Sequence, residues 1–318
     1  MKKKLSLLLL TFVLAVLAAC GNTEKSNAEA DSSKASEKPA EIKVTHELGE
    51  DTVPVNPKKV VAFDFGILDT LDKLGIEVAG VPQANIPPYL SKYEDSKYAN
   101  VGSLKEPDFE AISELAPDVI FISGRQSAAY EELKKIAPTV YVGVDTTDYM
   151  NSFKHNMNLI GDIFDKKQEV ADELAKIDED IATINEKAKT IDGKSLIVLV
   201  NDGSLSAYGK NSRFGIIHDV FGLAPADENI EASTHGQKVT FEYLAEKNPA
   251  YLFVIDRGAV VGGESSGEKT LDNKLVNGID AAKNDHIVYL DPSYWYLSGG
   301  GLLSTSEMVK EILDAISE

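Results

Sequence analysis

The chain has 318 residues with 32 Lys or Arg and 51 Asp or Glu, which gives a formal charge of −19. A chain this acidic repels phosphate backbones, so nucleic acid is excluded as an expected partner. Because the only cysteine is Cys20, a disulfide within the chain or a metal site built from several cysteines is excluded too.

The N-terminal segment has the pattern of a secretory signal peptide. Lysines at positions 2–4 precede an apolar run over residues 5–19, which is shorter than the about 20 residues that span a bilayer. The run ends in LAACG, which resembles a lipobox, and in lipoproteins with such a box the cysteine is lipidated and becomes the mature N-terminus. We therefore expect residues 1–19 to be removed, which changes the charge from −19 to −22, and Cys20 to anchor the protein on the extracytoplasmic face of the cell membrane. The alternative is an ordinary signal peptide followed by a chance cysteine.

Residues 20–41 are predicted to be a lipidated, disordered tether. After Cys20 this segment is rich in Ser, Ala, Glu and Lys and contains no aromatic and no branched aliphatic residue. Such a composition cannot bury a hydrophobic core. The folded part is expected to begin near residue 42, and its length suggests about two domains.

Residues 42–165 are predicted to form an N-terminal α/β lobe. Buried strands are expected at 59–66, 78–81, 118–122 and 139–144, and helices at 67–74, 109–115 and 130–136. This alternation implies βαβ units and a mainly parallel sheet.

A long helix is predicted over residues 166–191, which contain neither Gly nor Pro. Asp165 is a suitable N-cap for it. A helix of this length would span about 39 Å. Its position between two α/β halves suggests a rigid connector, although a surface helix or a short coiled coil would have the same pattern. The apolar stripe consists of Val170, Leu174, Ile177, Ile181, Ile184 and Ile191.

Residues 192–318 are predicted to form a second α/β lobe, with strands at 195–200, 251–255 and 286–290. An internal repeat supports this arrangement. Phe109-Glu110 is followed by a proline, a strand and Arg125, and Phe241-Glu242 is followed at matching offsets by a proline, a strand and Arg257. A period of about 130–150 residues is too long for a solenoid and fits two similar lobes.

Only three arginines occur among the 32 basic residues, and all lie in or beside loops around predicted strands. Arg125 and Arg257 follow strands, and Arg213 precedes the helix expected at Phe214-Gly215. Ligands of open parallel sheets bind beyond the carboxyl ends of the strands. Because a planar guanidinium holds several oxygen atoms at once, the three arginines indicate an anion-binding cleft between the lobes. Surface ion pairs with the abundant acids are the alternative.

Aromatic residues and glycines gather in the second half, at Tyr294, Trp295 and Tyr296 and at residues 299–301. The glycines precede a predicted helix and could offer backbone N–H groups to an anion; a plain turn with core aromatics is the alternative. No dinucleotide-binding or Walker sequence occurs, so nucleotide binding has little support. His235 lies in a polar loop, and the histidines of the chain lack metal-ligand spacing.

These features together resemble a known family. The chain is similar over nearly its whole length to the substrate-binding lipoproteins of iron–siderophore ABC importers, in particular to the catecholate binders, and most of all to the ferric-petrobactin-binding lipoproteins of Gram-positive bacteria. The segments 61–66, 101–109 and 296–301 carry the resemblance. It implies two Rossmann-like lobes with mainly parallel sheets joined by one long connector helix, with no intrinsic cofactor and with Fe(III) carried as a siderophore complex.

The resemblance also implies roles for single residues. Arg125, Arg213 and Arg257 would hold the anionic ferric chelate. His235 and Tyr296 match positions that in some catecholate binders coordinate iron that the siderophore leaves incompletely coordinated. Other residues expected to bind the ligand are Lys105, Tyr294 and Trp295.

Delivery is expected to use one glutamate from each lobe. Glu110 and Glu242 match the glutamates that pair with permease arginines in importers of this family; stabilisation of a helix N-terminus is the alternative. The implied protein is a monomer and not an enzyme, and it hands a ferric siderophore to an ABC permease with a cytoplasmic ATPase. Three other classes stay open: a haem or cobalamin binder of the same fold, a binder of bare zinc or manganese, and an exported hydrolase, for which no Gly-x-Ser-x-Gly sequence occurs.

Overall fold

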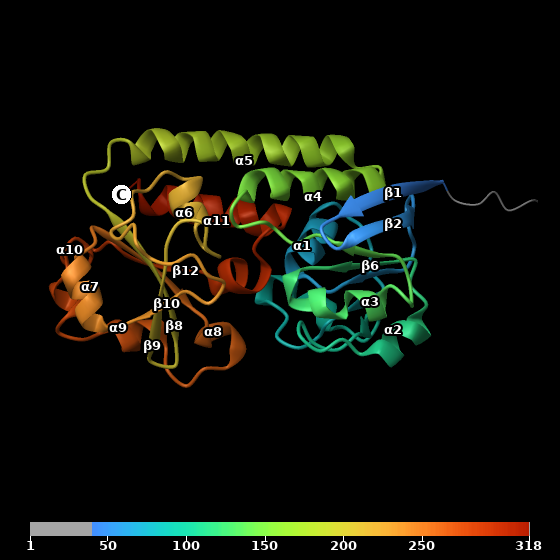
Figure 1. Cartoon of the computed structure of the whole chain (residues 1–318), viewed down its shortest axis with the longest axis horizontal. Helices are drawn as coiled ribbons and strands as arrows, with labels where there is room; N and C mark the ends of the chain where they lie inside the picture. Colours follow the sequence, from blue (N-terminus) through green and yellow to red (C-terminus); the bar gives the residue numbers. More distant parts are fainter. Residues whose placement is uncertain (1–39, 318) are drawn as a thin grey trace, which may run out of the picture. The chain divides into compact units, whose positions relative to one another are not determined.

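The computed structural model describes residues 40–317 (Figure 1). The predicted signal peptide, the lipidation of Cys20 and nearly all of the predicted tether lie outside these residues. The tether prediction is wrong at its last residue, because Glu41 begins strand β1 (Glu41–His46). This strand pairs antiparallel with β2 (Gly49–Pro54), and Val44 and Val53 anchor the hairpin in the hydrophobic core. The hairpin is not among the predicted elements.

Five parallel strands form the N-terminal sheet, in the order β5-β4-β3-β6-β7. The strands β3, β4 and β6 are fully buried, as is usual for a parallel sheet covered by helices. The predicted βαβ arrangement is therefore confirmed here. The strands are β3 (Val60–Ala62), β4 (Gly80–Val81), β5 (Ala99–Asn100), β6 (Val119–Ile122) and β7 (Thr139–Tyr141). The connections contain α1 (Phe65–Lys73), the 3₁₀ turns η1 (Pro88–Glu94) and η2 (Gly124–Ala129), α2 (Phe109–Leu115) and α3 (Tyr130–Leu133).

Helix α4 (Tyr149–Phe164) precedes the long helix α5 (Lys167–Ala188), and the two pack against each other (Figure 1). Helix α5 is shorter than the predicted 166–191, but all of its buried residues belong to the predicted apolar stripe. Asp165 is not its N-cap. It ends α4 in the left-handed conformation with φ of 55°, which Asp tolerates because its short polar side chain can hydrogen-bond locally.

The C-terminal sheet has the strand order β10-β9-β8-β11-β12. The strands β8, β11 and β12 are parallel, whereas β9 runs antiparallel to both of its neighbours. The parallel part is predicted from the sequence, and β9 and β10 are not. The strands are β8 (Ser195–Asn201), β9 (Ser204–Tyr208), β10 (Gln237–Val239), β11 (Tyr251–Asp256) and β12 (Ile287–Leu290). The helical segments are α6 (Ile216–Asp219), α7 (Phe241–Lys247), α8 (Gly258–Val261), α9 (Gly267–Leu271), η3 (Val276–Gly278), α10 (Asp280–Lys283), η4 (Ser293–Ser298) and α11 (Leu302–Ala315).

Helix α11 follows the C-terminal sheet in the chain but packs against α1 and α5. Its first N–H groups are satisfied by α1: the buried carboxylate of Asp69 accepts from the backbone N–H of Leu303 at 3.2 Å and of Ser304 at 3.1 Å. The approach is so close that a Cβ atom at Gly301 would clash with the backbone oxygen of Gly66, so glycine is required there. One hydrophobic cluster consequently includes residues of both sheets and of α1, α4, α5 and α11.

Candidate ligand site

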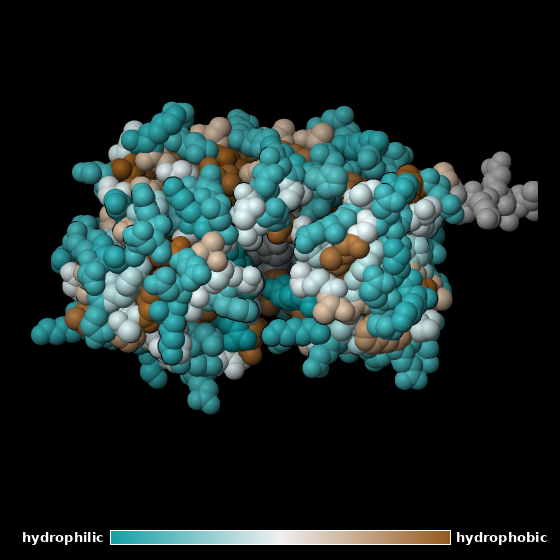
Figure 2. Space-filling model, in the orientation of Figure 1, coloured by the Kyte–Doolittle hydropathy of each residue, from teal (hydrophilic) through white to brown (hydrophobic). Residues whose placement is uncertain are grey.

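A cavity of about 700 Å³ is lined by residues that follow strands of both sheets. The space-filling view shows the surface hollowed near the middle of the face (Figure 2). Polar and charged side chains dominate its lining, and several of them belong to the candidate residues predicted from the sequence. They are Glu47, Asp64, Ser123, Arg125, Tyr141, Asp145, Thr146, Tyr149, Arg213, Thr234, His235, Tyr296 and Ser298.

The three arginines converge on Tyr296. The Nη2 atom of Arg125 donates to the backbone oxygen of Tyr296 at 2.7 Å, and Nη2 of Arg213 donates to the same oxygen. The Nε atom of Arg257 donates to the Tyr296 hydroxyl at 2.8 Å. The guanidinium carbon of Arg213 lies 4.3 Å from the centre of the Tyr296 ring, within the range of a cation–π contact. One residue of η4 therefore fixes all three cations.

The fold explains why residues so far apart in sequence meet here. Arg125 lies in η2 directly after β6, and Arg257 precedes α8 directly after β11. Both strands are parallel members of their sheets, and the loop at the carboxyl end of β6 lines the cavity through Gly124 and Arg125. Arg213 comes from the loop between β9 and α6, and Tyr296 from the helical turn η4 after β12.

The electrostatics of this cluster favour an anion. Burial and then the charge of Arg125 lower the pKa of Arg213, which shows that the two cations are close and poorly hydrated. Burial alone would raise the pKa of the Tyr296 hydroxyl, but the hydrogen bond from Arg257 and the charges of all three arginines outweigh burial and lower this pKa from its ordinary value. The cluster thus stabilises negative charge, on a tyrosine phenolate or on a bound ligand.

The remaining candidate residues occupy different environments. His235 is exposed and lines the cavity. Trp295 also lines it but is only 2% exposed, and its Nε1–H donates to Glu311 at 2.6 Å. Three other candidates are not among the lining residues, namely Arg257, Lys105 and Tyr294. Arg257 also donates to Asn201 at 2.6 Å. The Lys105 side chain is exposed, and the Tyr294 ring packs on the Tyr89 ring. A direct ligand contact by these three stays a prediction.

Two of the three backbone N–H groups of the glycine segment, residues 299–301, have partners within the protein. The Gly299 N–H donates to the backbone oxygen of Tyr294 at 2.7 Å, and the Gly301 N–H donates to Ser304 Oγ at 3.1 Å. The carboxylate of Asp69 already occupies the N-terminus of α11. A side chain of the protein itself therefore supplies the anion at the start of α11, and anion binding by the glycine segment stays a prediction.

Glu110 and Glu242 are exposed and begin their helices, as the repeat predicts. Asp108 caps α2 and Thr240 caps α7, each accepting from a backbone N–H of its own helix. Neither glutamate lines the cavity, so both carboxylates are available at the surface.

Sequence reasoning missed the carboxylates of the cavity. Asp64 could have been found from its place at the end of a buried strand run, where a ligand-facing loop begins. Glu47 could not, because it lies in the turn of the hairpin that the sequence pattern does not reveal. Within residues 40–317 no group of three or more His, Cys, Asp or Glu side chains could hold a bare metal ion, and no helix is long and apolar enough to cross a membrane.

Comparison with known proteins identifies the family. The model of the periplasmic binding protein family matches residues 60–294. The chain belongs to the periplasmic binding protein family. Its members are extracytoplasmic substrate-binding proteins and not enzymes, and the resemblance stated from the sequence is confirmed.

Relatives with assigned ligands cover nearly the whole chain. The petrobactin-binding protein YclQ of Bacillus subtilis is 53% identical over 99% of this chain and 100% of its own length. The ferric-anguibactin-binding protein FatB of Vibrio anguillarum is 31% identical over 86% of both chains.

Solved structures agree with the fold described above. The crystal structure of YclQ from Bacillus subtilis superposes with a TM-score of 0.85 at 55% identity, covering 88% of this chain and 99% of that one. The periplasmic catecholate-siderophore binding protein VctP of Vibrio cholerae has a TM-score of 0.82 at 35% identity, covering 86% and 99%. The predicted fold class, two α/β lobes of the helical-backbone type, is confirmed.

Proposed function

We propose that this protein captures an anionic ferric siderophore of the catecholate type, similar to petrobactin, and delivers it to an ABC permease for iron uptake. The observation that carries the proposal is the convergence of Arg125, Arg213 and Arg257 on Tyr296 at the cavity wall. A ferric catecholate is a compact anion with an aromatic rim, so guanidinium groups neutralise it and aromatic side chains pack on its faces. The relatives named for petrobactin and catecholate binding support this ligand class.

The acidity of the whole chain does not oppose anion binding. Charges more than about 8–10 Å from the ligand are screened at physiological salt. Inside the cavity the two cations Arg125 and Arg213 lie close enough to lower the pKa of Arg213, and a bound anion relieves their repulsion. Local charge therefore decides the sign of the ligand.

Direct coordination of iron belongs to the same proposal. Tyr296 has a lowered pKa, and His235 lines the same cavity with an exposed side chain. A phenolate and an imidazole suit Fe(III), and they would complete the coordination of a chelate that leaves sites open. With a hexadentate chelate these two side chains only contact the ligand.

Delivery and anchoring complete the proposal. Glu110 and Glu242, exposed at the starts of α2 and α7, would pair with arginines of the permease. A lipid on Cys20 would keep the protein, acting as a monomer, at the membrane surface next to that permease.

The test is a fluorescence titration of the only tryptophan, Trp295, which lines the cavity. The panel contains ferric catecholates, a ferric hydroxamate, haem, cobalamin, ZnCl₂ and MnCl₂. Tight saturable quenching by a ferric catecholate, unchanged by EDTA, is the expected result. Tight binding of haem or cobalamin alone, or of a bare metal ion that EDTA reverses, would replace the proposed function.

A further inference from the structure

The cavity that holds the arginines also carries carboxylates. Glu47, Asp64 and Asp145 line it together with Arg125 and Arg213. Asp64 is accounted for by the fold: its carboxylate accepts from the N–H groups of the first turn of α1 at 2.8 and 3.1 Å, and burial raises its pKa. Glu47 and Asp145 form no ion pair within residues 40–317.

The unpaired carboxylates, here called the acidic face (Glu47 and Asp145), are both exposed. Hydrogen bonds from the hydroxyl and the N–H of Thr147, each at 2.8 Å, lower the pKa of Asp145, so it is charged at neutral pH. Two charged carboxylates on the wall of a cavity would repel a ligand that is purely anionic. Their presence beside the arginines indicates a ligand that carries both signs of charge.

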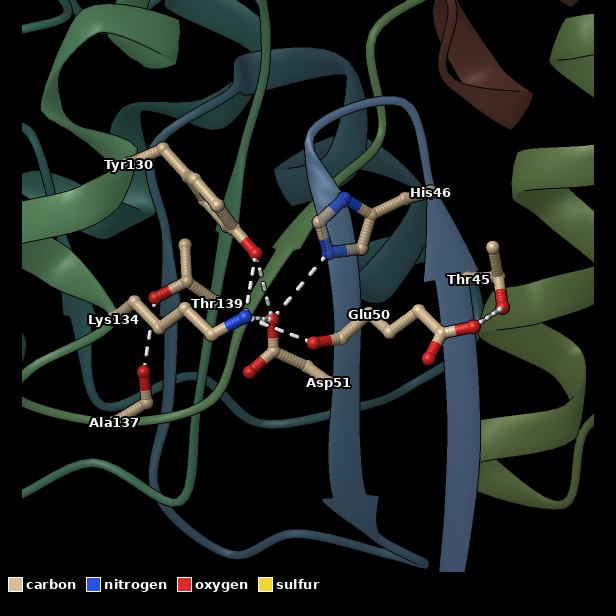
Figure 3. A network of polar contacts seen from close by, with 8 residues as sticks. All are labelled: Thr45, His46, Glu50, Asp51, Tyr130, Lys134, Ala137 and Thr139. Carbon is tan, nitrogen blue, oxygen red and sulfur yellow. Dashed lines mark hydrogen bonds and ion pairs between the residues drawn. The ribbon is translucent and has the colours of Figure 1, made fainter.

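The hairpin that carries Glu47 is held by the network shown in Figure 3. Glu47 lies in the turn between β1 and β2, and Asp51 of β2 accepts from the Tyr130 hydroxyl at 3.0 Å and pairs with Lys134 at 3.1 Å. Lys134 also donates to the backbone oxygen of Glu50 at 2.8 Å, and the buried His46 ring packs edge-on against Tyr130. The hairpin is therefore fastened to α3 and the residue that follows it, at positions on both sides of the turn that contains Glu47.

Two tyrosines, Tyr141 and Tyr149, also line the cavity. Burial, with added effects of the Glu47 and Asp64 charges, raises the pKa of Tyr141 to about 12, so its hydroxyl keeps its proton. Tyr149 lines the same cavity and is 8% exposed, and its buried hydroxyl lies beside the Thr305 hydroxyl.

We propose that the acidic face binds a protonated amine of the ligand. The ligand class is then a ferric chelate with an anionic iron centre at Arg125 and Arg213 and an ammonium group that reaches Glu47 and Asp145. This inference rests on the proposed function and narrows it. A chelate without a cationic group would leave the carboxylates of the acidic face without a partner of opposite charge. The hairpin of β1 and β2 is thus a determinant of ligand choice.

The experiment compares two probes by isothermal titration calorimetry. One is the ferric complex of a bis-catecholamide whose linker contains a secondary amine, and the other has a methylene group in place of that amine. Wild-type protein should bind the amine probe about three- to tenfold more tightly, the range for ion pairs that stay partly hydrated. The double variant Glu47→Gln/Asp145→Asn should bind both probes about equally.

The matched control is Glu50→Gln. Glu50 lies on the same hairpin, is exposed and pairs with Lys43, but it does not line the cavity. This variant should keep the wild-type preference, and far-ultraviolet circular dichroism should show all variants folded. Equal wild-type affinity for the two probes, or a preference that survives in the double variant, overturns the inference and leaves the proposed function standing. Binding of neither probe overturns both.

Discussion

Substitution of the three arginines should weaken ligand binding to different extents, because they make different numbers of hydrogen bonds within the protein and only two of them line the cavity. Arg213 lines the cavity and makes one hydrogen bond, to the Tyr296 backbone oxygen. Arg125 also lines the cavity but makes two, to the backbone oxygens of Tyr296 and Leu297. Arg257 uses Nε on the Tyr296 hydroxyl and Nη1 on Asn201, and it is not a lining residue.

The expected magnitudes follow from these contacts. A hydrogen bond to a charged group contributes about 1.5–3 kcal/mol, so Arg213→Ala should weaken binding of a ferric catecholate about 10- to 150-fold. Arg125→Ala should lose a similar or slightly smaller amount. Arg257→Ala should lose about threefold or less, because Arg257 is not a lining residue and already donates to Tyr296 and Asn201.

The assay is quenching of Trp295 fluorescence at fixed ionic strength, repeated at high salt, where the losses should shrink. Urea unfolding of each variant is the control, and the midpoints should stay close to that of wild type because none of these arginines belongs to the hydrophobic core. An Arg257→Ala loss equal to that of Arg213→Ala would refute the ordering. Unchanged affinity in all three variants would show that the arginines do not bind the ligand.

Four further outcomes test other parts of the molecule. His235→Ala/Tyr296→Phe should abolish the added charge-transfer absorbance with a tetradentate ferric catecholate but bind a hexadentate one almost normally; an unchanged spectrum would exclude coordination by the protein. Asp69→Ala should lower the free energy of unfolding by about 2–5 kcal/mol, because two buried N–H groups lose their acceptor, and a loss below about 1 kcal/mol in urea titrations would contradict that role. Burial raises the pKa of the Asp69 carboxyl to about 7, against about 4 in the unfolded chain. Because the folded state holds this proton more tightly, the free energy of unfolding of the wild type should fall as the pH rises from about 4 to about 7. Asp69→Asn should reduce this dependence on pH. Glu110→Ala/Glu242→Ala should bind siderophore normally yet support little uptake in cells, and normal uptake at equal expression would leave only the helix-terminal role.

The predictable part of the fold is the part with strong local patterns. Runs such as residues 119–122 and 196–200 are continuously apolar, and parallel strands between helices have that signature. The same patterns place Arg125 and Arg257 at strand ends, which is why their positions could be anticipated. The repeated Phe-Glu pair correctly predicts α2 and α7, since each helix begins at its Phe.

The missed features depend on contacts between distant segments. The hairpin of β1 and β2 contains few apolar residues, and only packing of Val44 and Val53 into the core reveals it. Asp165 was assigned to the start of α5 because aspartate is favoured at N-caps, yet the same residue type also tolerates the left-handed end of α4. Whether the first N–H groups of α11 are free depends on Asp69, more than 230 positions away in sequence.

The position of α11 has a consequence for how the chain matures. Helix α11 packs beside α1, and its Leu303 and Ser304 N–H groups donate to the buried carboxylate of Asp69. The N-terminal half therefore reaches its final packing only after residues 302–315 have been made. A variant that lacks α11 deprives Asp69 of two donors and α1 of its packing partner, so we expect it to unfold more readily and to be degraded faster by proteases.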